Sequence, residues 1–383
     1  MIQRDVSYVG GPIFDGRRLL DGHAARFLNG VLAEIFPLAS RAAQAKTIDL
    51  NGDILSPGYV DLQVNGGDGI LLNDDPSPEA IARIAAAHRS LGATSILPTL
   101  ITDTAAKTRA AIEAAILATQ SGLSGVAGLH LEGPHLSVAR KGAHDGALIR
   151  PMTDADLAQL IDAAARLPVL MVTIAPENVT RAQVQALATA GVIVSLGHSD
   201  ADYATCVDYA EAGARCVTHL FNAMSQLGNR EPGLVGAAIA CDDLFAGLIA
   251  DGIHVHPASI GAAWRAKSAH EQIFLVSDSM AVAGTDTREF LLNGRRIQRQ
   301  DGRLTLADGT LAGADLDLTT AVRTLSQVPG IDLGSALAAA TTVPARLIRA
   351  EQDLVAVTKA QESNFIRIAP DLSRAQPLCE VSV

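Results

Sequence analysis

The chain of 383 residues is too long for one small core and long enough for a large barrel or for two domains. It carries 30 Lys and Arg against 41 Asp and Glu, and the formal net charge of −11 argues against a broad surface for nucleic acid or anionic membranes. Hydrophobic residues make up 48% and aromatic residues only 3%, so aliphatic side chains must fill the core, as in α/β proteins. We therefore expect a compact α/β protein without nucleic-acid or membrane partners.

The start of the chain, MIQRDVSYVG, places Arg4 and Asp5 where a signal peptide would have an apolar run. Aspartates at 242 and 243 interrupt the best apolar candidate for a membrane span, so we expect a cytoplasmic protein. The cysteines lack CxxC spacing and are interpreted as small buried apolar side chains; they are Cys206, Cys216, Cys241 and Cys379.

Both ends of the chain have the pattern of short strands. Residues 1–53 contain apolar runs separated by GG, DG and NG turn signals, and residues 351–383 contain the strand-like run NFIRIAPDL. We expect these two segments to form a small β-sandwich domain beside the rest of the chain.

Residues 54–350 have the alternating pattern of a (β/α)8 barrel of the TIM type. Short apolar runs alternate with Ala-rich stretches of helical period. The predicted strands are 54–62, 93–97, 125–131, 168–174, 191–196, 214–218, 244–250 and 272–277. The predicted helices are about 78–91, 104–120, 153–166, 180–190, 200–212 and 256–268, with two closing helices at about 315–327 and 333–349. NG and DG turns predict a β-hairpin insertion at about 288–310.

Polar residues follow the predicted strands. In such barrels the active site lies where the carboxyl ends of the strands meet their loops. A helix cap or a buried polar contact would explain any one of these residues, but their convergence at one face favours a functional site. They are Gln63 with Asn65, Thr99, Glu132, Glu177, His198, His219, Asp251 with His254, and Asp278.

Glu132, His198 and His219 offer the ligands of a catalytic zinc site, one carboxylate and two imidazoles, with a position left for water or substrate. A metal held in this way lowers the pKa of water and polarises a carbonyl, so the pattern indicates hydrolysis. For a single histidine, a hydrogen-bonded core position would be the simpler interpretation. The three residues together in one barrel favour metal binding.

Further residues near the predicted mouth suit acid-base chemistry or ligand binding. Asp278, in LVSDSM, could take a proton from water and return it to a leaving nitrogen, with a structural role or a helix N-cap as the alternative. His144 and His254 lie in loops and suit a polar ligand. Arg230, in GNREPG, suits a phosphate or a carboxylate, with a solvated surface position as the alternative. Asn222, in FNAM, is placed to orient a substrate.

Several of these residues stand in longer motifs that follow one another along the chain: HLEGPHLS at 130–137, KGAH at 141–144, GHSDADYA at 197–204, THLFNAM at 218–224, REPGLVGA at 230–237, DGIHVHP at 251–257 and LAGA at 311–314. Together with PGYVDLQVNG near residue 57, this ordered set resembles the N-acetylglucosamine-6-phosphate deacetylase family of the amidohydrolase superfamily. The resemblance extends over nearly every predicted barrel loop.

This resemblance implies a reaction and the residues that carry it. A member of the family removes acetate from N-acetyl-D-glucosamine 6-phosphate in amino-sugar catabolism. The resemblance implies that Glu132, His198 and His219 bind a divalent metal, expected to be Zn²⁺, and that Asp278 is the catalytic acid and base. It also implies a homodimer, in which Arg230 could serve the neighbouring subunit. The residues implied to bind the sugar phosphate are Ala143, His144, Asn222, Ala223, Arg230, Asp251, His254, Leu311, Ala312 and Gly313.

Two positions depart from the usual patterns. Many amidohydrolases carry His-x-His at the end of the first strand, where this chain has Gln63 and Asn65. Amides are poor ligands for transition metals, so we expect one metal ion per subunit, with Gln63 in a supporting role. Ser279 and Met280 follow Asp278 where the family more often has Ala-Thr, a difference that concerns sugar preference and pocket shape.

Two alternatives remain at this point. The same barrel could deacetylate a related sugar phosphate, such as N-acetylgalactosamine 6-phosphate, or hydrolyse a cyclic amide, although the loop around Arg230 favours a sugar phosphate. A non-catalytic sugar-phosphate-binding protein is the other alternative. The complete set of metal ligands with Asp278 argues against it, because a protein that only binds has no need of a hydrolytic metal and base.

Overall fold

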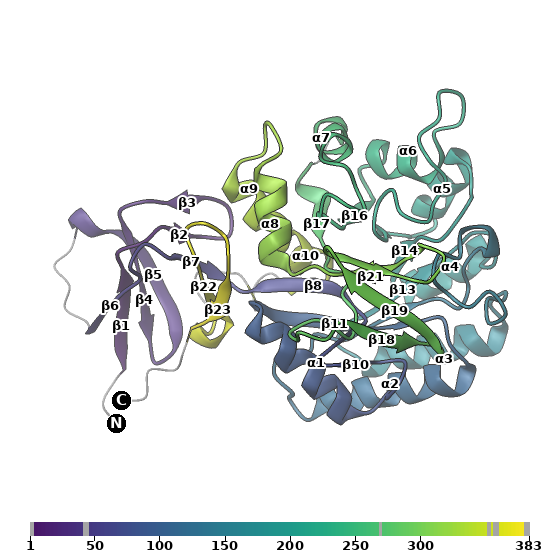
Figure 1. The fold of residues 1–383 in the computed structure, drawn as a ribbon, viewed down its shortest axis with the longest axis horizontal. Coiled ribbons are helices and arrows are strands. Elements are labelled where there is room, and N and C mark those ends of the chain that lie inside the picture. The colour runs from purple at the N-terminus through teal and green to yellow at the C-terminus, as the bar shows by residue number, and fades with distance from the viewer. Residues whose placement is uncertain (1–3, 41–45, 268–269, 351–353, 355–359, 379–383) are drawn as a thin grey trace.

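The chain folds into a barrel of parallel strands and a smaller β-domain at its side (Figure 1). The computed structural model describes residues 4–40, 46–267, 270–350, 354 and 360–378. The first strand, β1 (Asp5–Val9), and the last, β23 (Ala375–Pro377), both lie in the smaller domain. Among the described residues, no helix is both long enough and apolar enough to cross a membrane.

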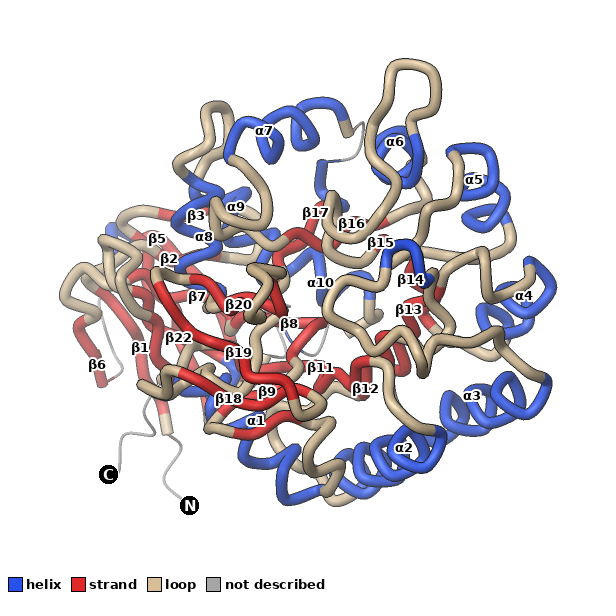
Figure 2. The backbone as a smooth tube through the Cα atoms, turned by 45° about the vertical axis from the view of Figure 1, so that its right-hand side comes forward, coloured by secondary structure: helices blue, strands red, loops and turns tan. Residues whose placement is uncertain are grey.

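The predicted (β/α)8 architecture is confirmed. Eight strands lie side by side in sequence order, each parallel to the next, and the helices surround them (Figure 2). Every residue of β8, β12 and β13 is buried, so these strands are covered on both faces, as expected of a sheet inside a ring of helices. The strands are β8 (Tyr59–Val64), β11 (Ala93–Ile101), β12 (Leu129–Glu132), β13 (Leu170–Ile174), β14 (Ile193–Leu196), β15 (Cys216–Val217), β16 (Phe245–Leu248) and β17 (Ile273–Leu275).

The barrel closes between the end of β8 and the residues that follow β17. The Asp278 N–H donates to the Gln63 carbonyl at 3.1 Å, and the Asn65 N–H donates to the Ser279 carbonyl at 2.9 Å. Val64 and Ser279 form a parallel bridge at the same place. This seam therefore puts two amide side chains beside Asp278.

Most helices around the barrel begin at polar caps; α6 and α10 have no side-chain cap. Thr153 and Asp156 form a capping box at the start of α3, and Thr180 and Gln183 form another at the start of α4. These caps satisfy N–H groups that the helix itself leaves free. The helices are α1 (Pro78–Ser90), α2 (Ala105–Gln120), α3 (Asp154–Arg166), α4 (Arg181–Thr189), α5 (Tyr203–Glu211), α6 (Gly233–Ala240), α7 (Pro257–Ala266), α8 (Leu318–Ser326), α9 (Leu333–Ala340) and α10 (Thr342–Leu347).

Two features of the helices were not predicted. Helix α6 was missed because its sequence, GLVGAAIA, is apolar all round and has no amphipathic period to recognise. The single helix predicted at 333–349 is two helices, with a break at Thr341 (φ −130°). Pro344 in the first turn of α10 has no N–H to donate, so one continuous helix would lose a hydrogen bond there.

The smaller domain is a sandwich of two sheets built from both ends of the described chain. A buried cluster that includes Phe27 of one sheet and Phe365 of the other fills the space between them, and these two rings meet edge to face at 5.1 Å. One sheet has the order β5 (Val31–Pro37), β4 (His23–Leu28), β1 and β6 (Lys46–Asp49), and the other has the order β23, β22 (Phe365–Ile368), β7 (Ile54–Pro57), β2 (Ile13–Phe14) and β3 (Leu19–Leu20).

The run predicted as one barrel strand at 54–62 is divided between the two parts. Strand β7 pairs with β22 and β2 in the smaller domain, whereas β8 starts the barrel. Gly58 separates them, and a Cβ at this position would come within 2.0 Å of the Thr94 Oγ1. Only glycine permits this close approach where the chain passes from one part to the other.

The insertion after β17 is larger than the predicted hairpin. It forms a four-stranded antiparallel sheet of β18 (Glu289–Leu292), β19 (Arg295–Gln300), β20 (Arg303–Thr305) and β21 (Leu311–Ala314). The Asn-Gly and Asp-Gly pairs at 293–294 and 301–302 have positive φ at both positions, as two-residue hairpin turns require. Leu292, Ile297 and Leu304 of this sheet pack on Met280, so the sheet is fixed to the barrel beside Asp278.

The cysteines that the structure describes are free thiols. Cys206 and Cys216 are buried, which agrees with their interpretation as apolar side chains, and Cys241 is partly buried. Cys379 lies outside the described residues.

Candidate active site

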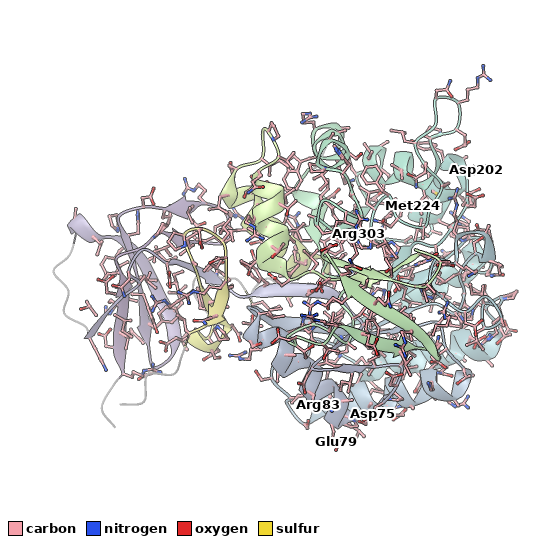
Figure 3. All side chains as sticks on the ribbon, in the orientation of Figure 1. Asp75, Glu79, Arg83, Asp202, Met224 and Arg303 are labelled. Carbon is pink, nitrogen blue, oxygen red and sulfur yellow. The ribbon has the colours of Figure 1, made fainter. Side chains whose placement is uncertain are left out.

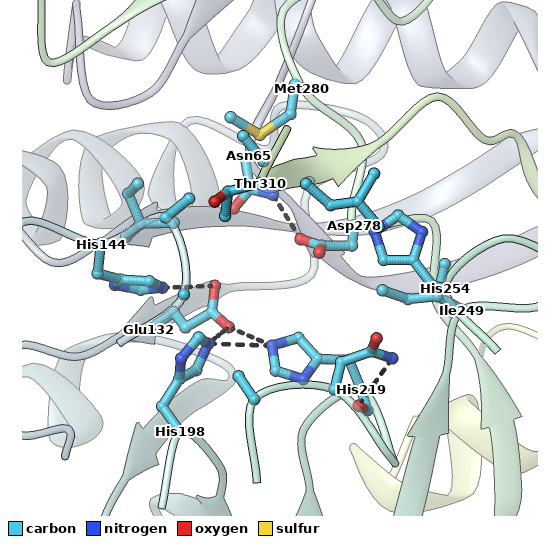
Figure 4. A pocket seen from close by; sticks show the side chains of 18 of the residues that line it. Asn65, Glu132, His144, His198, His219, Ile249, His254, Asp278, Met280 and Thr310 are labelled. Atoms are coloured by element: carbon cyan, nitrogen blue, oxygen red, sulfur yellow. Dashed lines mark hydrogen bonds and ion pairs between the residues drawn. The ribbon is translucent and has the colours of Figure 1, made fainter. Parts of the chain in front are cut away.

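A cavity of about 550 Å³ opens at the carboxyl ends of the barrel strands, where the sequence places the chemistry (Figure 4). Its walls come from the barrel loops and from the insertion sheet. The lining residues are Asn65, Ile101, Glu132, Ala139, Arg140, Gly142, Ala143, His144, His198, His219, Asn222, Ala223, Ile249, His254, Asp278, Met280, Leu292, Gly309, Thr310, Leu311, Ala312 and Gly313.

Three side chains converge at the base of this cavity. Glu132 Oε1 lies 3.2 Å from His198 Nε2 and 3.0 Å from His219 Nε2, and the two imidazole nitrogens are 3.1 Å apart. All three residues are buried. Within the described part of the chain, they are the one group of three or more His, Cys, Asp and Glu side chains whose possible ligand atoms all lie within 4.8 Å of one another.

The hydrogen bonds of the neutral His198 ring fit a cation in this triangle. His198 Nδ1 is 2.8 Å from the Arg140 carbonyl, which can only accept, so Nδ1 carries a proton and, in the neutral ring, Nε2 presents a lone pair. That lone pair faces Glu132 Oε1, which is also an acceptor in the ionised carboxylate. A proton on His219 Nε2 can satisfy only one of its two contacts, whereas a cation at the centre would satisfy all three atoms.

The size of the triangle also fits a metal ion. A tetrahedral ion with bonds of about 2.0–2.1 Å separates its ligand atoms by about 3.3 Å, close to the distances of 3.0–3.2 Å found here. The backbone carbonyl that fixes His198 is the kind of outer contact that orients metal-binding histidines. Gln63 turns its Nε2 to Glu132 Oε1 at 3.1 Å, so its amide supports the carboxylate through an N–H donor.

Asp278 lies beside this triangle and is held by two amides. Asn65 Nδ2 donates to Asp278 Oδ1 at 2.7 Å, and Gln63 Nε2 donates to the same oxygen at 3.2 Å. Burial, and then the charge of Glu132, raise the pKa of Asp278 to about 6. A carboxyl group with this pKa can both accept and return a proton near neutral pH.

The backbone that presents these residues is unusual. His198 (φ 48°), His219 (φ 32°) and Asp278 (φ 47°) all adopt left-handed conformations, as do Phe221 (φ 78°) and Ala223 (φ 48°). Residues other than glycine adopt the left-handed region at an energetic cost, and such backbone strain concentrates at functional sites. Each of the three functional residues lies just after its strand, where the chain turns sharply into the cavity.

His144 faces the triangle from the loop after β12. Its Nδ1 accepts the Thr102 N–H at 3.3 Å, so its Nε2 bears the proton, 3.9 Å from Glu132 Oε2. Burial, followed by the charges of nearby groups, lowers the pKa of His144 to about 3, which keeps the ring neutral at pH 7. His144 therefore presents a neutral N–H donor to the cavity.

His254 approaches from the opposite side of the cavity. Its Nδ1 is 2.6 Å from Asp251 Oδ2, and Asp251 Oδ1 accepts the N–H groups of Ile253 and His254 at 2.8 Å. Asp251 thus does not line the cavity itself; it fixes the ring of His254, which does. Asn222, Ala223, Leu311, Ala312 and Gly313, predicted at this site, all line the cavity.

Arg230 is the predicted site residue that the structure places elsewhere. It is exposed and does not line the cavity of its own chain. The loop that carries it leaves the barrel after Met224 (Figure 3) and projects from the molecule before α6 (Figures 1 and 2). The predicted contact of Arg230 with a ligand is therefore not found in the cavity of its own chain.

Among the cavity residues that received no role of their own from the sequence are Asn65 and Arg140. Asn65 was noted at the end of the first strand, but its contact with Asp278 depends on closure of the barrel. Arg140 lines the cavity, pairs with Asp200 at 2.7 Å and offers its carbonyl to His198. Nothing in the sequence distinguishes Arg140 from other surface arginines.

The fold and this cavity define a (β/α)8-barrel protein with a three-residue candidate metal centre at the end where such barrels carry catalysis. Residues 54–377 match the amidohydrolase family. The chain therefore belongs to the amidohydrolase family.

Named relatives narrow the comparison. An N-acetylgalactosamine-6-phosphate deacetylase from Shewanella sp. (strain ANA-3) is 40% identical over 322 residues, which cover 84% of this chain and 81% of the relative. An N-acetylglucosamine-6-phosphate deacetylase from Haemophilus influenzae is 32% identical over 351 residues, 91% of each chain.

Solved structures agree with these relatives. The crystal structure of N-acetylglucosamine-6-phosphate deacetylase from Pasteurella multocida has a TM-score of 0.90 with 31% identity and covers 97% of both chains. A mutant of the Mycobacterium smegmatis deacetylase, solved in complex with N-acetyl-D-glucosamine-6-phosphate, has a TM-score of 0.86 with 27% identity and covers 97% of this chain and 96% of that one.

Proposed function

We propose that this amidohydrolase removes the acetyl group from N-acetyl-D-glucosamine 6-phosphate, giving D-glucosamine 6-phosphate and acetate. The observation that carries the proposal is the convergence of Glu132, His198 and His219 with Asp278 in one cavity. The deacetylases among the relatives support an amino-sugar 6-phosphate as the substrate class. N-acetyl-D-galactosamine 6-phosphate is the second candidate substrate, favoured by the 40% identity with the Shewanella relative.

Glu132, His198 and His219 would hold one divalent metal ion, for which the two imidazoles and one carboxylate favour Zn²⁺. When bound there, such an ion supplies the Lewis acidity that polarises an amide carbonyl and makes water a stronger acid. Gln63 and Asn65 donate N–H groups to carboxylates and so leave no second ligand set at the end of β8.

Asp278 acts as the general base and then as the general acid. Its carboxylate accepts a proton from the attacking water, and the same carboxyl group then protonates the nitrogen of the departing amino sugar. His144, a neutral donor through Nε2, is placed to stabilise negative charge on the amide oxygen as the carbonyl is attacked. Asn65 and Gln63 keep the Asp278 carboxylate in one orientation throughout.

The remaining cavity residues bind the sugar phosphate. His254, fixed by Asp251, and Arg140 supply polar and cationic groups, while Asn222 and Ala223 lie beside His219. Binding of parts of the substrate remote from the reacting amide holds that amide in place for attack. We further propose a homodimer in which Arg230 completes the phosphate site of the neighbouring subunit, because it is exposed and does not line the cavity of its own chain. The cytoplasmic location expected from the sequence stays a prediction.

The test of substrate identity is a comparison of kcat/KM for acetate release from the two sugar phosphates and from unphosphorylated N-acetylglucosamine. We expect N-acetylglucosamine 6-phosphate to be the best of the three and the unphosphorylated sugar to be the worst, since it lacks the anion. A higher value for the galactosamine epimer would establish the second candidate. Binding of either sugar phosphate without any acetate release would instead indicate a non-catalytic binding protein.

A further inference from the structure

A chain of four polar side chains runs through the barrel interior beneath the candidate metal ligands. Ser195 Oγ lies 2.6 Å from Thr218 Oγ1, which lies 2.7 Å from Thr173 Oγ1, which in turn lies 2.7 Å from His130 Nε2. This chain of hydrogen bonds ends at the Leu62 carbonyl, 3.0 Å from His130 Nδ1. None of the four side chains belongs to the proposed reaction, and all are buried.

The hydrogen bonds in this chain run in one direction. The Leu62 carbonyl can only accept, so His130 Nδ1 carries the proton and, in the neutral ring, Nε2 accepts from the Thr173 hydroxyl. Because the Thr173 hydroxyl donates its hydrogen bond to the His130 ring, its oxygen accepts from the Thr218 hydroxyl. The Thr218 oxygen in turn accepts from the Ser195 hydroxyl. Every hydroxyl in the chain is therefore used as both donor and acceptor except the first.

This chain connects the three strands that present the candidate ligands. His130 is in β12, two residues before Glu132, and Ser195 is in β14, three residues before His198. Thr218 directly precedes His219. Thr173, in β13, bridges β12 to the other two strands.

The strand before His219 is the shortest of the barrel, and backbone bonds from the Thr218 N–H to the Leu196 carbonyl at 2.9 Å and from the Leu220 N–H to the Gly247 carbonyl at 2.7 Å extend its pairing. Strand β15 consists of two residues, and it pairs with each neighbour through only two residue pairs. The hydroxyl of Thr218 adds two side-chain bonds where that short strand ends. The hydroxyl therefore links the residue before His219 to Thr173, in a strand that its own backbone does not pair with.

The residue before His198 is Gly197, and it packs directly against Thr218 and Thr173. Gly197 has no side chain, and a Cβ there would approach the Thr218 Cβ to 2.9 Å and the Thr173 Cγ2 to 3.0 Å. The glycine thus leaves room for both threonines directly under the ligands. This packing is a second observation, independent of the hydrogen bonds, that links the chain to the ligand-bearing loops.

We propose that Thr218, with Ser195, Thr173 and His130, forms a set of positioning residues that hold the three ligands in the arrangement that binds the metal ion. The inference rests on the metal site of the proposed function. Metal ligands must be held within about 0.5 Å of their productive positions, and a directional chain of hydrogen bonds fixes relative strand positions more closely than apolar packing does. Thr218 is the centre of the set because it joins two strands and adjoins a ligand.

The experiment measures the dissociation constant for Zn²⁺ by competition with a chromophoric chelator, and the visible spectrum of the Co²⁺-loaded protein. Thr218→Val keeps the shape and removes the hydroxyl, and we expect it to weaken metal binding by about tenfold and to change the Co²⁺ spectrum. Thr218→Ser restores the hydroxyl and should return both readouts close to the wild type. Thr341→Val is the matched control, because Thr341 is equally buried and donates only to the Leu337 carbonyl at 2.8 Å.

The outcomes separate this inference from the proposed function. If Thr218→Val folds and binds Zn²⁺ as tightly as Thr341→Val does, the positioning role is overturned although the metal site stands. If Thr218→Val does not fold, Ser195→Ala tests the end of the same chain, and unchanged metal affinity there would also overturn the proposal. If the wild-type protein binds no divalent metal, the proposed function itself fails.

Discussion

Asn65 donates a hydrogen bond from Nδ2 to Oδ1 of Asp278 at 2.7 Å, across the seam where the barrel closes. The two residues are separated by 213 positions in the sequence, and the backbone bonds of the seam hold them together. Gln63 donates both to Asp278 and to Glu132, so two amides serve two buried carboxylates. The orientation of the Asp278 carboxylate, the proposed base, therefore depends on two amides at the end of β8, the first strand of the barrel.

The first prediction concerns the pH dependence of this base. Burial and the charge of Glu132 raise the pKa of Asp278 to about 6, and the bond from Asn65 opposes that rise. Asp278 must be ionised to accept a proton, so kcat/KM should fall as the pH falls through about 6. Asn65→Leu removes a bond to the charged form, and the acidic limb of the kcat/KM profile should move to higher pH. An unmoved limb, or one at lower pH, would contradict this assignment.

The second prediction concerns Asp278 itself. Asp278→Asn keeps the size of the side chain but removes the group that takes and returns the proton. We expect kcat to fall by about 10²-fold to 10⁴-fold while substrate affinity, measured by calorimetry, stays close to that of the wild type. Asp68→Asn, which changes an exposed carboxylate paired with Arg83 outside the cavity, controls for loss of charge. An active Asp278→Asn protein would remove this residue from its proposed role.

The third prediction is one metal ion per chain. The triangle of Glu132, His198 and His219 offers three ligand atoms, and the amides of Gln63 and Asn65 donate instead of binding metal. Elemental analysis after equilibration with Zn²⁺ should give about one equivalent in the wild type and much less in His198→Ala. Two equivalents per chain, lost together in that variant, would mean that a second ion shares this site.

Much of the barrel could be predicted because its signal is local. Apolar runs alternate with helical periods over residues 54–278, and polar residues follow the runs, so the strand order and the common mouth of Glu132, His198, His219 and Asp278 follow from known barrel geometry. The structure brings these four residues into one cavity. Their roles in metal binding and catalysis stay predictions.

What could not be predicted depends on contacts between distant segments. The partnership of Asn65 with Asp278 needs the closed seam, and Arg140 acts on His198 through a backbone carbonyl that any residue would offer. The division of 54–62 into two strands follows from pairing of β7 with β22, more than 300 residues away. Helix α6 lacks an amphipathic pattern because all its sides are covered.

The fourth prediction tests whether Arg230 serves a second subunit. Arg230→Gln should raise KM for the sugar phosphate by about tenfold with a smaller effect on kcat, because a charged contact to the phosphate is lost. Mixed dimers of Arg230→Gln and Asp278→Asn chains should regain activity at low substrate, since one site then has both an intact base and a partner arginine. If mixing adds nothing to the separate activities, Arg230 does not act across subunits.

The fifth prediction concerns stability away from the active site. Asp156 caps α3 and accepts two bonds from Arg150 at 2.5 and 2.6 Å, and the Arg150 guanidinium holds the pKa of this carboxyl well below its usual range. The stabilisation is therefore present at pH 7 and is lost as the pH falls below about 4. Asp156→Asn should lower the free energy of unfolding by about 1–2 kcal/mol at pH 7.

Denaturant unfolding of Asp156→Asn at pH 7 and at about pH 2.5, below the ordinary pKa of an aspartate, measures this effect. The difference from the wild type should shrink at the lower pH. Asp162→Asn, in the same helix and with a more exposed carboxylate, should change stability little. An equal loss of unfolding free energy in both variants at pH 7 would show that the bonds of Asp156 to Arg150 and Thr153 do not stabilise the protein more than an exposed ion pair does.

The central claim is metal-dependent deacetylation of an amino-sugar 6-phosphate at the cavity of Glu132, His198, His219 and Asp278. Its most direct test is acetate release from N-acetylglucosamine 6-phosphate and N-acetylgalactosamine 6-phosphate by the metal-loaded protein, by the chelated protein and after metal is restored. We predict release by the loaded protein, loss on chelation and recovery with about one equivalent of metal per chain. No release from either sugar phosphate with any divalent metal, or undiminished release by the stripped protein, would contradict the claim.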